Sequence, residues 1–139
     1  MKLSIYLLPF ALVILGISTT QGQSTDVADK ELTWKSSELT DKNYAKNISS
    51  SLRLITKGRT TIELHRGSEQ TLTFTITSVT GTWNDEKQEG RLVYTVRSSN
   101  DVPGKVTVER KGNSVTAWVD FTQTNKNGLN IELKIDTIE

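Results

Sequence analysis

The chain has 139 residues, with 17 lysines and arginines against 16 aspartates and glutamates, which fits one domain that is close to neutral. This balance leaves no basic excess of the kind that binds nucleic acid or an anionic membrane surface. The chain contains no cysteine, and this excludes disulfides, zinc–thiolate sites and thiol nucleophiles.

Residues 1–22 have the pattern of a secretory signal peptide. Lys2 precedes an apolar run over residues 3–17, which is shorter than the roughly 20 residues that cross a bilayer. Thr20 and Gly22 suit the −3 and −1 positions of a signal peptidase site. We therefore expect cleavage near Gly22 and no membrane span in the mature protein, with an uncleaved anchor as the alternative.

An exported domain without disulfides has to be stabilised by its core alone. Small secreted eukaryotic domains usually rely on disulfides. The absence of cysteine therefore favours a secreted or periplasmic bacterial protein. Lys2 is the one charged residue of the predicted signal, so basic and acidic residues are equal in number after its removal.

The first part of the mature chain gives mixed signals. Residues 23–30 are polar and are predicted to be flexible, and residues 31–139 to form a single β domain. A strand is predicted over residues 31–35. A short helix or ordered loop is predicted over residues 41–50, because nearby apolar residues partly fit a helical stripe, namely Leu39, Tyr44, Ala45, Ile48 and Leu52.

From residue 51 onward, apolar and polar residues alternate in a series of short runs. This alternation is typical of half-buried strands, and it is clearest over residues 60–65, 71–77, 91–97, 105–109, 114–121 and 130–136. Short glycine-containing turns separate the runs and leave no room for crossover helices. We predict an all-β antiparallel meander, closed into an up-and-down barrel of about eight to ten strands, with a β-sandwich as the alternative.

The second half also carries a recurring glycine-containing pattern. Gly81-Thr82-Trp83-Asn84 ends one run, Gly90-Arg91-Leu92 opens the next, and Gly128-Leu129-Asn130 opens the last. This pattern resembles the small secreted lipocalin-like (calycin) domains of Bacteroidetes-type bacteria. The resemblance implies an up-and-down barrel with an internal cavity and a binding role without catalytic residues. Unlike that family, the chain has no Gly-x-Trp on its first strand, where Trp34 follows Leu32-Thr33.

Trp118 is the most suggestive candidate for ligand binding. It interrupts the polar face of its predicted strand, between Thr116 and Asp120, and an exposed indole can stack on a sugar or line a pocket. The alternative is packing beneath residues 36–51. Tyr94 is expected in the core with its hydroxyl at the rim, and Trp83 at one end of the β structure. The candidate ligand-binding residues are Trp118, Thr116, Asp120, Tyr94 and Trp83.

The sequence offers little catalytic chemistry. His65 is the only histidine, so a metal site would have a single imidazole ligand and no thiolate, and no Gly-x-Ser-x-Gly motif accompanies it. We expect no metal, no cofactor and no enzymatic activity. The sequence favours a secreted binding module for a small apolar or sugar-like ligand. A structural or protein-interaction module without a ligand cavity is the alternative, and a small hydrolase is a third hypothesis.

Overall fold

The computed structural model describes residues 26–68 and 70–139, so the predicted signal peptide lies outside the described residues. One 3-10 helix, η1 (Val27–Asp29), precedes eight strands. The strands are β1 (Glu31–Asp41), β2 (Lys46–Lys57), β3 (Thr61–Arg66), β4 (Gln70–Thr82), β5 (Gly90–Ser98), β6 (Pro103–Lys111), β7 (Ser114–Asp120) and β8 (Asn130–Ile138). Within this part of the chain, no helix is long and apolar enough to span a membrane.

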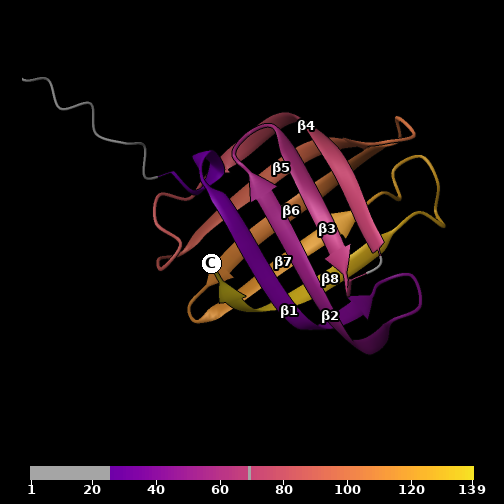
Figure 1. The fold of residues 1–139 in the computed structure, drawn as a ribbon, viewed down its shortest axis with the longest axis horizontal. Helices are drawn as coiled ribbons and strands as arrows, with labels where there is room; N and C mark the ends of the chain where they lie inside the picture. Colours follow the sequence, from indigo (N-terminus) through magenta and orange to yellow (C-terminus); the bar gives the residue numbers. More distant parts are fainter. Residues whose placement is uncertain (1–25, 69) are drawn as a thin grey trace, which may run out of the picture.

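The eight strands form one closed antiparallel barrel in which each strand pairs with its neighbours in the sequence (Figure 1). Strand β8 returns to β1 and closes the sheet. The predicted all-β up-and-down barrel is confirmed, at the lower end of the expected strand number, and the sandwich alternative is excluded. Short turns join most consecutive strands, and longer loops over residues 83–89 and 121–129 join β4 to β5 and β7 to β8. Short turns of this kind direct the chain into a meander.

Alternation decides which side chains enter the barrel. On β5, for example, Leu92, Tyr94 and Val96 are buried, whereas the residues between them are partly exposed. Threonines take many of the outward positions on β4, where branched side chains favour extended backbone and hydroxyls tolerate water. The core is therefore the barrel interior.

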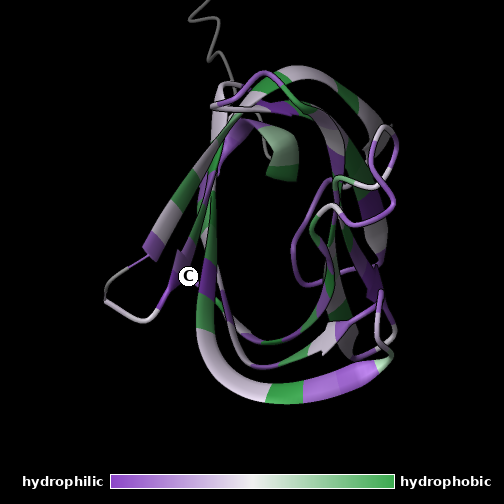
Figure 2. Ribbon diagram, turned by 90° about the vertical axis from the view of Figure 1, so that its right-hand side faces the viewer, coloured by the Kyte–Doolittle hydropathy of each residue, from purple (hydrophilic) through white to green (hydrophobic). Residues whose placement is uncertain are grey.

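The start of the described chain differs from the expected flexible segment. Val27 and Ala28 are fully buried, and the Val27 amide donates a 2.8 Å hydrogen bond to the carbonyl of Trp83. In Figure 2 the short coil of η1 lies within the outline of the strands at one end of the barrel. Two apolar residues in a polar stretch suffice to dock the helix there, because that end would otherwise expose the core to water.

The predicted helix over residues 41–50 is wrong, and the alternative of an ordered loop holds only for the turn over residues 42–45. Strands β1 and β2 occupy most of this range and pair with each other, with Leu39 opposite Ile48. A β-bulge between Ser36 and Glu38 shifts the register. The bulge interrupts the two-residue period before Leu39. Tyr44 and Ala45 are exposed in the turn between β1 and β2, so they do not form an apolar face with Ile48. Consequently no helix covers Trp118.

Candidate binding site at the open end of the barrel

The two ends of the barrel differ in how they are closed. At the end that carries η1, the rings of Trp34 and Trp83 are buried with their centroids 5.4 Å apart. We call this the closed end. The opposite end, which we call the open end, carries the turns after β1, β3 and β5 and the loop 121–129 after β7. Two neighbouring apolar pockets lie there.

The first, which we call the aromatic pocket, has a volume of about 330 Å³. The rings of Phe74 and Phe121 line it, and their centroids are 4.8 Å apart. Leu72, Val102 and Leu129 add apolar walls. Polar groups at the pocket come from the two adjoining loops, namely Ser98, Ser99, Asn100, Thr124 and Asn125.

The loop 121–129 holds Phe121 in place by close backbone contacts. The Phe121 amide donates a 2.7 Å hydrogen bond to the carbonyl of Leu129. A Cβ at Gly128 would collide with the Phe121 carbonyl, and a Cβ at Gly104 would collide with its ring. Glycine at these two positions therefore lets the loop fold tightly and lets the Phe121 ring reach the barrel wall.

The second, which we call the aliphatic pocket, has a volume of about 200 Å³. Aliphatic side chains from five strands and the last loop line it: Leu39, Ile48, Leu52, Leu64, Leu72, Leu129 and Ile131. Asp41, Arg66 and Gln70 add polar groups. Arg66 lies opposite the buried Leu52 and opposite Gln70 in the sheet register. Directly opposite residues share a face, so Arg66 and Gln70 belong to the inner face at the rim.

Leu72 lines both pockets and is the most unusual side chain of the open end. It pairs with Leu64, which is buried, so Leu72 also belongs to the inner face of the barrel. Nevertheless 48% of Leu72 is exposed. An inward-facing leucine that is left half exposed marks an apolar surface that nothing in the described chain covers.

Comparisons with protein-family models, curated proteins and solved structures found no match for this chain. Its function is therefore inferred from the geometry and chemistry of the molecule.

The residues predicted from the sequence do not gather at the open end. Trp118, Thr116 and Asp120 share the outer face of β7, where 38% of Trp118 is exposed. Tyr94 and Trp83 are buried inside the barrel. None of the five lines the aromatic or the aliphatic pocket.

Sequence reasoning missed the residues that build the open end. Leu72 lies at the turn end of an alternating run, and Phe121 directly precedes a loop rich in asparagine. In both cases the sequence places an apolar residue at the end of a strand. Such a position is where an inward-facing residue comes closest to the mouth of a barrel.

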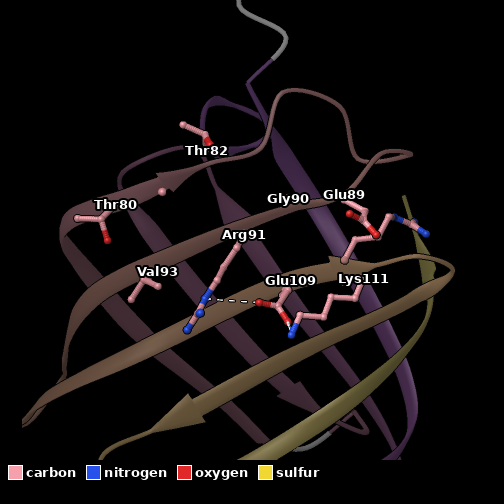
Figure 3. A pocket seen from close by; sticks show the side chains of 10 residues that line it. Thr80, Thr82, Glu89, Gly90, Arg91, Val93, Glu109 and Lys111 are labelled. Atoms are coloured by element: carbon pink, nitrogen blue, oxygen red, sulfur yellow. Dashed lines mark ion pairs between the residues drawn. The ribbon is translucent and has the colours of Figure 1, made fainter.

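A larger but shallow depression of about 660 Å³ lies on the outer face of β4, β5 and β6. Figure 3 shows its charged side chains, with Glu109 between Arg91 and Lys111. The Glu109 carboxylate lies 3.6 Å from Nε of Arg91 and 3.5 Å from Nζ of Lys111. These exposed charges largely neutralise each other. The depression therefore offers few unpaired groups that could bind a ligand selectively.

His65 takes part in a chain of polar contacts on the outer face of β3 and β4. Its Nδ1 lies 3.1 Å from the Thr71 hydroxyl, and its Nε2 lies 2.8 Å from the Glu63 carboxylate. Lys57 also contacts Glu63, at 2.8 Å. Hydrogen bonds from Lys57 and then His65 lower the pKa of Glu63. A hydroxyl, an imidazole and a carboxylate are thus in hydrogen-bond reach, as in a hydrolase triad, but they line neither open-end pocket.

Metal binding finds no support in the described residues, where no group of three or more histidine, aspartate or glutamate side chains converges. The candidate functional site of the barrel is therefore the open end, with its two apolar pockets and polar rim.

Proposed function

We propose that the protein is an exported, non-enzymatic binding protein that holds a small apolar ligand at the open end of its barrel. The observation that carries this proposal is Leu72, which faces inward between two apolar pockets and is 48% exposed. Its exposure leaves apolar surface in contact with water, whereas the other leucines of the eight strands are buried.

A ligand that covers Leu72 gains the hydrophobic free energy of that surface, about 25 cal/mol for each Å² removed from water. The aromatic pocket, at about 330 Å³, lies at the lower end of the range of roughly 300–1,000 Å³ for small-molecule sites. The aliphatic pocket shares the Leu72 and Leu129 wall with it. A compact ligand with one branch or ring in each pocket fits this arrangement.

The polar groups at the mouth supply orientation. Asn100 and Asn125 offer both amide donors and acceptors at the aromatic pocket, and Ser98 and Ser99 lie nearby. A few polar groups around an apolar floor are typical of pockets that select one pose of a ligand. Entry is from the open end, because Trp34, Trp83 and η1 fill the other end.

Binding is tested with N-phenyl-1-naphthylamine, a neutral dye whose fluorescence rises in apolar surroundings. The wild-type protein is expected to bind the dye, and Leu72→Asp to weaken binding about tenfold or more, the equivalent of at least 1.4 kcal/mol. Trp118→Ala, on the outer face, is the matched control and is expected to bind as the wild type does. Unchanged melting temperature would show that Leu72→Asp still folds.

No fluorescence change with the wild-type protein, or equal binding by Leu72→Asp, would contradict the proposal and favour the interaction module without a ligand. Native mass spectrometry of protein purified from its own host provides a second test, since a bound natural ligand adds to the mass. The same measurement tests export, because cleavage near Gly22 would give a chain that begins close to Gln23.

A further inference from the structure

A second surface, on the outer face of β7, β8 and β1, has a different chemistry. Trp118 is 38% exposed there, whereas Trp34 and Trp83 are buried. Its register partner on β8 is Glu132, and Glu132 in turn pairs with Thr40 on β1. An indole is thus placed among polar side chains, on a surface that gives it no apolar neighbour in the sheet register.

The Trp118 ring is held in one orientation. Its Nε1 donates a 2.7 Å hydrogen bond to Oδ1 of Asn130. Nδ2 of Asn130 donates to Oδ1 of Asn43 at 3.4 Å, and Nδ2 of Asn43 donates to the Gly128 carbonyl at 2.9 Å. This chain of amides ties the indole to the β1–β2 turn and to the loop 121–129. The ring is therefore preorganised, which reduces the entropy lost on binding.

A polar pocket of about 220 Å³ lies on the same face, and although Trp118 does not line it, its sheet neighbours Thr116 and Glu132 do. Every side chain that lines it carries a hydroxyl, carboxylate or ammonium group: Glu38, Thr40, Ser114, Thr116, Glu132 and Lys134. Thr116 precedes Trp118 by one outward position on β7, and Glu132 lies directly opposite Trp118. The surface therefore presents an aromatic plane and a set of hydrogen-bonding groups side by side.

This combination matches a pyranose ring, which has an apolar face of C–H groups and an edge of hydroxyls. The indole offers a large flat apolar surface to the first. Carboxylate and ammonium groups form charge-assisted hydrogen bonds with the second. The two carboxylates of the pocket are matched by its one lysine and by Lys42, which lies 3.4 Å from Glu132. The balance favours a neutral ligand over a charged one.

A protein partner that adds a strand is poorly suited to this surface. Such partners need an unpaired sheet edge, and β7, β8 and β1 are each paired on both sides in the closed barrel. The pocket also lacks the apolar centre that carries most of the affinity of protein interfaces.

We propose that Trp118 and the adjoining polar pocket form a binding site for a neutral saccharide. Trp118 stacks on the face of one pyranose ring, while Glu132, Lys134 and Thr116 bind its hydroxyls. This site is separate from the open end and does not depend on the apolar-ligand function proposed above.

The test uses the indole N–H signals in a two-dimensional nitrogen–proton NMR spectrum, one from each of the three tryptophans. The Trp118 signal is assigned from its disappearance in Trp118→Phe. The protein is titrated with soluble neutral hexasaccharides, namely cellohexaose, laminarihexaose, xylohexaose and chitohexaose, up to about 10 mM, which covers millimolar dissociation constants. At least one is expected to shift the Trp118 signal and to leave those of Trp34 and Trp83 unchanged.

Variants then locate the site. Trp118→Ala is expected to weaken binding about tenfold or more, and Glu132→Gln, which leaves the core untouched, several-fold. Val93→Ala, on the outer face of β5, is the control and is expected to bind as the wild type does. Absence of any shift with all four sugars, or equal binding by Trp118→Ala, would overturn the proposal. Leu72→Asp is expected to retain saccharide binding, so failure at one site is distinguished from failure at the other.

Discussion

Trp34 and Trp83 join two strands that are not neighbours in the barrel. Their ring centroids lie 5.4 Å apart with the planes tilted by 44°. Trp34 lies on β1, and Trp83 directly follows β4. Nε1 of Trp34 donates to the Thr56 hydroxyl at 3.1 Å, and Nε1 of Trp83 donates to the carbonyls of Asp85 and Gln88. The pair therefore fills the closed end without leaving either indole N–H unpaired.

Trp83→Ala should lower the free energy of unfolding by about 3–5 kcal/mol, the usual cost of removing a buried aromatic ring. Chemical denaturation monitored by circular dichroism measures it, with an unchanged m-value as the sign of an intact two-state transition. Trp83→Phe retains most of the ring volume and should cost less. A loss of under about 1 kcal/mol in Trp83→Ala would mean that the closed end collapses around the gap or does not hold the barrel together.

Tyr94 carries the one buried side-chain polar atom that has no hydrogen-bond partner among the described residues, its hydroxyl oxygen. An unpaired buried hydroxyl costs about 1–3 kcal/mol. Tyr94→Phe removes it and keeps the ring, so this variant should unfold at equal or higher denaturant concentration than the wild type. Clear destabilisation would contradict this and would show that the hydroxyl is hydrogen-bonded, for example to a buried water.

The same residue predicts a pH dependence. Burial is the main cause that raises the pKa of Tyr94 to about 12, from an ordinary value of 10.0. The phenol ionises first in the unfolded chain, so ionisation does not affect the free energy of unfolding below pH 10 and lowers it as the pH rises toward 12. The melting temperature of Tyr94→Phe should therefore fall less steeply with alkaline pH than that of the wild type. Parallel curves would contradict this.

The alternating runs let most of the barrel be predicted from sequence. In β3 to β8 most inward apolar residues are followed by an outward polar one, and connections of two to nine residues join the strands, so the meander follows directly. Two places lacked such a local signal. The bulge at Ser36/Glu38 hid the pairing of β1 and β2, and η1 is docked by only Val27 and Ala28. Both depend on tertiary contacts that the local sequence does not display.

The candidate site was less predictable than the fold, for a related reason. Alternation placed Leu72 on the same face as Phe74 and Ile76, but whether an inward residue is covered depends on the loops at the mouth. Leu72 lies on β4, whereas Phe121 and Leu129 belong to the loop 121–129, and the fold of the barrel brings these two segments together. By contrast, the position of Trp118 on a polar outer face was visible in the sequence, because it required only the two-residue period.

Glu63 gives the barrel an acid-sensitive contact. Hydrogen bonds from Lys57 and then His65 lower its pKa from 4.5. The ionised Glu63 carboxylate therefore stabilises the folded state above pH 4.5, and this stabilisation is lost as the pH falls through the lower pKa of the folded state. The wild type should be more stable than Glu63→Gln at neutral pH, and the difference in melting temperature should shrink as the pH falls below 4.5. High salt should reduce it as well, because these groups lie near the surface. A difference that stays constant with pH would contradict this.

The Thr71–His65–Glu63 contacts test the non-enzymatic assignment most directly. Acyl transfer needs oxyanion donors and a bound substrate in addition to a nucleophile, base and acid. Strands β3 and β4 are paired on both sides, so their backbone amides are largely committed to the sheet. We therefore expect His65→Ala to hydrolyse p-nitrophenyl acetate at the same rate as the wild type, with no saturation in either protein. Saturable hydrolysis that disappears in both His65→Ala and Thr71→Val, while Thr73→Val retains it, would make the protein an enzyme and place its active site on this outer face.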